Sequence, residues 1–246
     1  SPEAYDRTLC LLPRDVVDFV LATQPLEWKK LEQHHGPAVR EQLLKRLATE
    51  IERRGALDVL RTGIKDSGCK FRLAYFRPAS GLNEETRRLH AANLFAVVRQ
   101  VHYSTRNEKS LDLVLFLNGI PILTAELKNP LNGQDVEDAI RQYKTDRDPR
   151  EPLLAYGRCL AHFAVDPDLV YVTTRLDRAG TRFRFIGIRR GIIIPIYKIP
   201  ALQIININVA VIFFAVSALG GIYPKVRRDI RMIQIHAGIN HRHHDF

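Results

Sequence analysis

The chain has 246 residues, of which 46% are hydrophobic, so it is long and apolar enough to bury a sizeable core, and disorder throughout is excluded. Its three cysteines stand at wide spacings without a CxxC pair. This indicates neither a disulfide framework nor a zinc site and fits a reducing, cytoplasmic setting. The net charge of +10 is concentrated at the end: 11 of the 37 Lys and Arg residues, but only 2 of the 27 acids, follow residue 177. Any nucleic-acid contact by the nearly neutral remainder must therefore depend on local patches.

The first part of the chain predicts helices and then strands. Residues 13–55 carry apolar side chains at helical spacing, and a Gly-Pro pair divides this segment in two. The apolar pattern shortens over residues 57–76, which predicts strands. Asn83 followed by two glutamates has the form of a helix start, and residues 93–103 are again strand-like.

Residues 111–128 are the most informative stretch, because an Asn-Gly pair at residues 118–119 joins two apolar runs. This pattern is a strong signal for a β-hairpin. A three-residue loop over residues 118–120 would place Leu117 opposite Pro121. A two-residue loop would shift the pairing by one residue, so the register stays a hypothesis.

The rest of the chain predicts one more helix, two more strands and a tail. The helix is expected over residues 136–143 and the strands over residues 162–165 and 169–173, so the fold class is α/β. Toward the end the chain becomes dense in isoleucine and arginine, poor in acids and without clear periodicity. We therefore expect a domain over residues 1–185 and a tail over residues 186–246 that is not part of it.

The tail contains an apolar run over residues 209–219, which is too short to span a bilayer, since spanning needs about 20 residues. We therefore expect no membrane contact. A buried or interfacial segment is one explanation of this run, and a reading-frame error or degenerate extension fits the abrupt change in composition best. The chain starts at Ser1 and its only methionine is Met232, so we also expect it to be a fragment.

Three charged residues interrupt the apolar runs of the predicted hairpin. In the three-residue register Asp112 lies opposite Glu126, and Lys128 shares the face of Glu126 because side chains alternate along a strand. Two carboxylates can hold Mg²⁺ through oxygen ligands, with the backbone carbonyl of Leu127 as a further ligand. Lys128 can orient water or stabilise developing negative charge. An exposed ion pair is the simpler explanation, but charge within apolar strands is costly unless it has a role.

This arrangement resembles the PD-(D/E)xK nuclease core, and the sequence around it is similar to R subunits of type I restriction-modification enzymes over nearly all of residues 5–185. The stretches that carry the resemblance are TQPLEW (23–28), RTGIKDSG (61–68), NLFAVVRQVHYS (93–104), SLDLVLFLNGIPILTAELKNPL (110–131), AIRQYKTDRDPREPLL (139–154) and HFAVDPDLVYVTTRL (162–176). The resemblance implies a restriction-endonuclease-like mixed sheet flanked by helices.

The resemblance also implies residue roles. Asp112 and Glu126 would be metal ligands for Mg²⁺, and Lys128 the catalytic lysine. An upstream helix in this fold often adds an acid, for which Glu50 is the candidate, although Glu41 or Glu52 fits the helical spacing comparably. The family's Gln-x-x-x-Tyr motif starts at Gln142 but meets Asp146 where tyrosine would stand, and Tyr143 is adjacent rather than equivalent.

Two further groups of polar residues have a functional and an ordinary interpretation. Arg99 and Gln100 are candidates for contact with the DNA backbone or the edge of the site, although half-exposed polar residues on a strand are common. Lys144, Arg147 and Arg150 are candidates for phosphate contact, but Asp146 and Asp148 interleave them, and a solvated mixed-charge loop fits this pattern better.

The resemblance implies a cytoplasmic, Mg²⁺-dependent endonuclease that cleaves double-stranded DNA and works with methylation and specificity subunits. No G-x-x-x-x-G-K-[ST] motif occurs in the sequence, so this chain holds no site for the ATP used by full-length R subunits. The alternatives are a stand-alone PD-(D/E)xK nuclease of repair or mobile-element type and an inactive remnant without enzymatic function.

Overall fold

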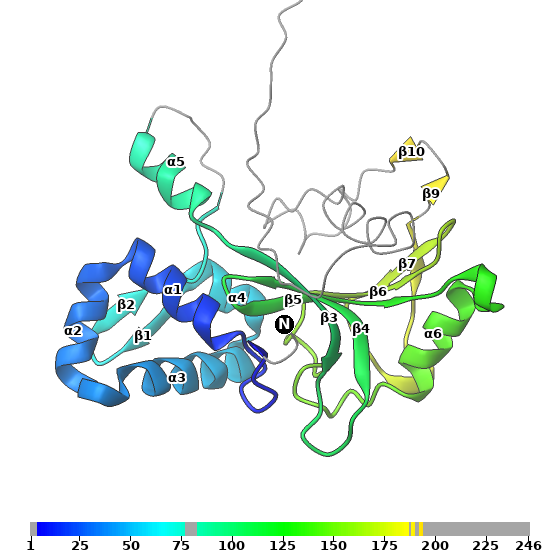
Figure 1. Ribbon diagram of the computed structural model, residues 1–246, viewed down its shortest axis with the longest axis horizontal. Helices are drawn as coiled ribbons and strands as arrows, with labels where there is room; N and C mark the ends of the chain where they lie inside the picture. The colour runs from blue at the N-terminus through cyan, green and yellow to red at the C-terminus, as the bar shows by residue number, and fades with distance from the viewer. Residues whose placement is uncertain (1–3, 77–82, 187, 190–191, 194–246) are drawn as a thin grey trace, which may run out of the picture.

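The computed structural model describes residues 4–76, 83–186, 188–189 and 192–193. They form a six-stranded mixed sheet with helices beside it (Figure 1), which confirms the predicted α/β fold. The predicted tail, residues 186–246, lies almost entirely outside the described residues, so the domain boundary stays a prediction.

The helices are α1 (Pro13–Thr23), α2 (Pro25–His35), α3 (Val39–Arg54), α4 (Ala56–Thr62), α5 (Glu84–Ala91) and α6 (Val136–Thr145). The strands are β1 (Ile64–Asp66), β2 (Cys69–Phe71), β3 (Phe95–His102), β4 (Ser110–Leu117), β5 (Ile120–Leu127), β6 (Ala161–Val165), β7 (Val170–Thr173), β8 (Arg184–Phe185), β9 (Ile188–Arg189) and β10 (Ile192–Ile193).

The large sheet has the strand order β3-β4-β5-β6-β7-β8. Among the strands that the structure describes in this sheet, β5 and β6 are parallel and the other neighbouring pairs are antiparallel. A parallel pair needs a crossover, and α6 lies within the connection from β5 to β6. The helix begins at a capping box in which the Asp135 side chain accepts from the backbone N–H of Asp138 and the Asp138 side chain accepts from the backbone N–H of Asp135.

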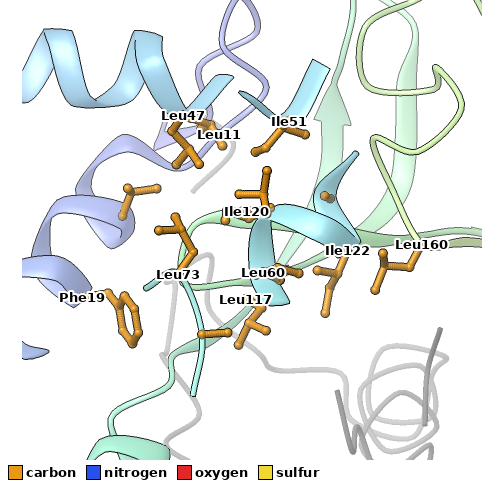
Figure 2. Packing of buried hydrophobic residues seen from close by; sticks show 14 of the residues in the cluster. Leu11, Phe19, Leu47, Ile51, Leu60, Leu73, Leu117, Ile120, Ile122 and Leu160 are labelled. Atoms are coloured by element: carbon orange, nitrogen blue, oxygen red, sulfur yellow. The ribbon is translucent and has the colours of Figure 1, made fainter. Parts of the chain in front are cut away.

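The helices α1 to α4 pack beside the small β1-β2 hairpin at one end of the molecule (Figure 1). Their apolar side chains meet those of the β4-β5 hairpin in the main core (Figure 2). Residues 57–62 were predicted as strand, and this prediction is wrong, because they belong to α4. Ala56, Val59 and Leu60 have helical i, i+3, i+4 spacing and are buried. A seven-residue segment is too short, however, to distinguish the helical repeat of 3.6 residues from the strand repeat of 2 by its apolar pattern.

The β4-β5 turn differs from the predicted three-residue loop. Leu117 pairs with Ile120 around a two-residue Asn118-Gly119 turn, in which both residues have positive φ, at 50° and 79°. This is the backbone geometry that favours Asn-Gly in hairpins. Pro121 therefore pairs with Phe116 and not with Leu117.

A β-bulge then restores the register that the site requires. The pairing shifts between Leu115 and Phe116, so Ile122 is the extra residue on β5, and beyond it Leu115 pairs with Leu123 and Leu113 with Ala125. One step further along this register, Asp112 lies opposite Glu126. The prediction that these acids face each other across the hairpin thus agrees with the register, although its turn was wrong.

The bulge also decides which face of β5 carries the acid. Before it, the even-numbered Ile120 and Ile122 contact the main core with the helices; after it, the odd-numbered Leu123 and Ala125 do so. A shift of one residue exchanges the faces of a strand. Glu126 is thereby directed away from this apolar core, toward the face that α6 covers.

Among the residues that the structure describes, no helix combines the length and the apolar character needed to cross a membrane.

Candidate active site

Asp112 and Glu126 occupy neighbouring central strands of the sheet. Asp112 is half-buried, and its Oδ2 accepts a hydrogen bond of 2.8 Å from the backbone N–H of Leu127. This bond crosses from β4 to the residue that follows Glu126, so it fixes the Asp112 carboxylate beside the end of β5. The side chain of Glu126 is fully buried.

The Glu126 carboxylate has one satisfied and one unsatisfied oxygen. Its Oε1 accepts from Arg147 Nε at 2.6 Å, whereas Oε2 is among the buried side-chain atoms of the described residues that lack a hydrogen-bond partner. Burial raises the pKa of Glu126 to about 8; Arg147 opposes this rise and the nearby Asp112 carboxyl adds to it. An unpartnered buried carboxylate oxygen beside a second carboxylate is costly in the absence of a cation.

The structure corrects the interpretation of Arg147 as part of a solvated loop. Its side chain is only 5% exposed, and besides Glu126 it donates from Nη2 to the carbonyl of Ser110 at 2.7 Å. Its guanidinium also lies 5.6 Å from the centre of the Tyr103 ring. The flanking aspartates hid this role in the sequence, because only the fold shows that Arg147 turns inward after α6 while Arg150 pairs with Asp148 at the surface.

Gln100 contacts the site from β3. Its Nε2 donates to Asp112 Oδ1 at 3.1 Å, and its Oε1 accepts from Ser110 Oγ at 3.0 Å. Gln100 has a positive φ of 50°, and β3 pairs with β4 on both sides of it, at Arg99 with Leu113 and at Val101 with Leu111, but not at Gln100 itself. The functional interpretation of Gln100 as a residue at the edge of the site therefore agrees with its position.

The remaining residues of the predicted nuclease site lie directly after β5 and on α6. Lys128 directly follows β5, is half-buried, and its backbone N–H donates to the carbonyl of Val165 at 2.8 Å. Gln142 lies on α6, and its buried Oε1 also lacks a hydrogen-bond partner among the described residues. Tyr143 is fully buried, and its hydroxyl forms a 2.8 Å hydrogen bond with Thr124 Oγ1 on β5, so it anchors α6 to the sheet.

Glu50, the weak candidate for a further ligand, has other partners. Its carboxylate receives Arg46 at 3.1 Å, Arg53 at 2.9 Å and Arg54 at 2.7 Å on the same helix, and the hydrogen bond from Arg53 is the main cause that lowers its pKa. Its alternative Glu41 pairs with Lys45 at 2.5 Å. Within the described ranges no three His, Cys, Asp or Glu side chains form a group suited to a metal ion, so the structure does not bring a third acid to Asp112 and Glu126.

The site therefore offers two adjacent carboxyl groups, a Glu126 oxygen without a hydrogen-bond partner in the described part of the chain, and a lysine directly after β5. Hard cations such as Mg²⁺ are often bound by one or two carboxylates and complete their coordination with water and phosphate oxygens. The donor set fits such an ion, because a cation would neutralise the facing acids and satisfy Glu126 Oε2.

Comparison with known proteins gives two matches. A family model described as "Type I restriction enzyme R protein N terminus" matches residues 22–181, which is more than half of the chain. A protein of Methanocaldococcus jannaschii, named as a candidate type I restriction enzyme MjaIXP endonuclease subunit, is 36% identical over 69 residues. That match covers 28% of this chain and only 6% of the M. jannaschii protein. No solved structure matches.

Proposed function

The chain belongs to the family of type I restriction enzyme R protein N termini, and from this premise we propose that it is a Mg²⁺-dependent endonuclease domain that cleaves double-stranded DNA. The observation that carries the proposal is the juxtaposition of Asp112 and Glu126 across the hairpin, with a buried Glu126 Oε2 that has no hydrogen-bond partner among the described residues. Family membership favours an R subunit over the stand-alone nuclease of repair or mobile-element type.

In this proposal Asp112, Glu126 and the backbone carbonyl of Leu127 hold the metal ion. When bound, Mg²⁺ supplies Lewis-acid polarisation of the phosphate and of its attacking water. Lys128 orients the water and stabilises the negative charge that develops on the phosphate. Gln142 is proposed to contact the substrate or the water from α6, because its side-chain oxygen is buried and unpartnered within the described part of the chain.

A plasmid cleavage assay tests this function. We expect the chain to nick or linearise plasmid DNA in Mg²⁺ and to lose this activity in chelator. Asp112→Ala and Glu126→Ala should abolish cleavage and metal binding, whereas Lys128→Ala should abolish cleavage and largely retain metal binding, because the lysine is not a ligand. Cleavage by Asp112→Ala at the wild-type rate would refute the assignment, and a folded wild-type chain that neither binds metal nor cuts would support the inactive remnant.

Recognition of a particular DNA sequence is not expected of this chain alone. We propose that methylation and specificity subunits of a restriction-modification system are its partners, because its family is that of R subunits. Co-expression with these subunits followed by size-exclusion chromatography should give a joint complex. Cleavage without any association would instead support a stand-alone nuclease.

A further inference from the structure

A chain of hydrogen bonds connects the two carboxyl groups of the site. It starts at Glu126 Oε1, which accepts from Arg147 Nε at 2.6 Å, and Arg147 Nη2 donates to the backbone carbonyl of Ser110 at 2.7 Å. The Ser110 hydroxyl donates to Gln100 Oε1 at 3.0 Å, and Gln100 Nε2 donates to Asp112 Oδ1 at 3.1 Å. Asp112 Oδ2 accepts from the N–H of Leu127 at 2.8 Å, and Leu127 is bonded to Glu126, so the ring is closed.

The orientation of the Gln100 amide follows from this chemistry. An ionised carboxylate has only acceptors, so the amide must present its NH₂ group to Asp112. The amide oxygen is then directed to the Ser110 hydroxyl, which can rotate to donate. Each bond of the ring consequently has one possible direction.

The backbone at Gln100 supports a specific role for this side chain. A non-glycine residue in the left-handed region is strained and persists where the surrounding structure determines its conformation. Gln100 combines this conformation with a missing ladder pair directly opposite Asp112. Because the side chain is exposed, burial of apolar surface does not explain the conformation.

We propose that Gln100 is a positioning residue for the metal site: together with Ser110 and Arg147 it closes a hydrogen-bonded ring that holds Asp112 and Glu126 in the arrangement that binds a divalent cation. The inference rests on the proposed function and extends it to residues that contact the ligands and not the ion. Groups that hold metal ligands in this way commonly change metal affinity by 10- to 100-fold when they are lost.

Titration calorimetry with MnCl₂ tests the ring. Gln100→Met removes the amide but keeps an unbranched side chain, so the backbone strain is unchanged, and we expect Mn²⁺ affinity to fall by about tenfold. Ser110→Ala should weaken binding less, because the amide remains but loses its orienting partner. The double variant should bind like Gln100→Met alone, since both changes break the same ring.

Two controls separate positioning from general damage. Gln33→Met makes the same chemical change at an exposed position of α2 and should bind Mn²⁺ like the wild type. In chelator, the melting temperature of Gln100→Met should match that of the wild type, because Gln100 is exposed.

Wild-type Mn²⁺ affinity in both Gln100→Met and Ser110→Ala would overturn the positioning role of the ring but would not contradict the proposed function. Additive losses in the double variant would also overturn it. A wild-type chain that binds no Mn²⁺ would overturn the proposed function and this inference together. If Gln100→Met does not fold, weaker binding by folded Ser110→Ala supports the ring and unchanged binding refutes it.

Discussion

The pair formed by Arg147 and Glu126 brings a guanidinium and a carboxyl group into the protein interior, with side chains 5% and 0% exposed. Removing ionisable groups from water is costly, and the cost is recovered only when the geometry and the further hydrogen bonds are good. Arg147 meets this condition through Glu126, the Ser110 carbonyl and the Tyr103 ring. Glu126 does not, because its Oε2 has no partner among the described residues. This imbalance is what a bound cation would correct.

Loss of the Arg147 guanidinium should therefore destabilise the fold. We expect Arg147→Met to lower the free energy of unfolding by about 3 kcal/mol, because it leaves the buried Glu126 carboxyl group and the Ser110 carbonyl without their hydrogen-bond donor. Urea denaturation would measure the change. Arg150→Met is the matched control on the same loop: its partner Asp148 is held at the surface and the Arg150 side chain is 74% exposed, so the expected loss is about 0–1 kcal/mol. Equal losses in the two variants would contradict the special role of Arg147.

The β4-β5 hairpin is the element that brings the acids together, and its turn is fixed by contacts on both sides. The Asn118 side chain donates to the Leu73 carbonyl at 2.8 Å and its Oδ1 accepts from the Leu94 N–H at 2.7 Å. The Gly119 carbonyl accepts from the Leu12 N–H at 2.9 Å, just before α1. The N-terminal helices and the site are thus linked through two turn residues.

Substitution of Gly119 tests this link. A Cβ at Gly119 would lie 2.6 Å from the Leu12 carbonyl oxygen and 2.8 Å from the Val16 nitrogen, and φ is 79°. Backbone atoms cannot move aside without disturbing the turn. We therefore expect Gly119→Ala to lower the free energy of unfolding by about 3 kcal/mol or more, because the steric overlap of the new Cβ with these atoms adds to the backbone strain at positive φ.

Gly133→Ala isolates the strain alone. Gly133 also has a positive φ, of 68°, but a Cβ there meets no atom within 4 Å, so a loss of about 1 kcal/mol is expected. Thermal unfolding of both variants gives the comparison. A Gly119→Ala variant as stable as Gly133→Ala would show that the turn is not tightly held.

The hairpin also shows which features of the site can be predicted from the sequence and which cannot. The Asn-Gly turn signal and the alternation of apolar residues identified both strands and the facing acids. The bulge at Ile122 was not predictable, because it lies inside an unbroken apolar run where either face appears buried. A three-residue loop without a bulge and a two-residue turn followed by a one-residue bulge give the same pairing at Asp112 and Glu126. The prediction that these acids face each other therefore agrees with the register although the predicted loop was wrong. Arg147 was missed for a related reason, since no local pattern distinguishes an inward arginine from its exposed neighbours.

At the scale of the whole molecule, α6 is held to the sheet by a buried polar cluster that includes a titratable group. Thr124 Oγ1 lies 2.8 Å from both the Tyr143 hydroxyl and His162 Nδ1. Burial lowers the pKa of His162 from 6.5 to about 4. The folded protein therefore keeps His162 neutral at pH values at which the unfolded chain takes up a proton.

This difference makes stability depend on pH. Between pH 6.5 and 4 the unfolded state binds one more proton at this residue, so the free energy of unfolding should fall by about 1.4 kcal/mol for each unit of acidification. Above pH 6.5 the group contributes no slope. Urea denaturation at several pH values should show that the free energy of unfolding depends less steeply on pH in His162→Asn, because asparagine does not titrate. Parallel curves of unfolding free energy against pH for the two proteins would contradict the assignment of this pH dependence to His162.

The central claim is that Asp112 and Glu126 together hold one divalent cation. Thermal and urea unfolding of the wild type with and without MgCl₂ or MnCl₂ tests it most directly. Metal that binds only the folded state should stabilise the wild type by about 2.7 kcal/mol when its free concentration is 100 times the dissociation constant. Asp112→Asn and Glu126→Gln should each lose this stabilisation, because neither leaves two facing carboxylates. A metal-induced gain in Asp112→Asn equal to that of the wild type would contradict the claim.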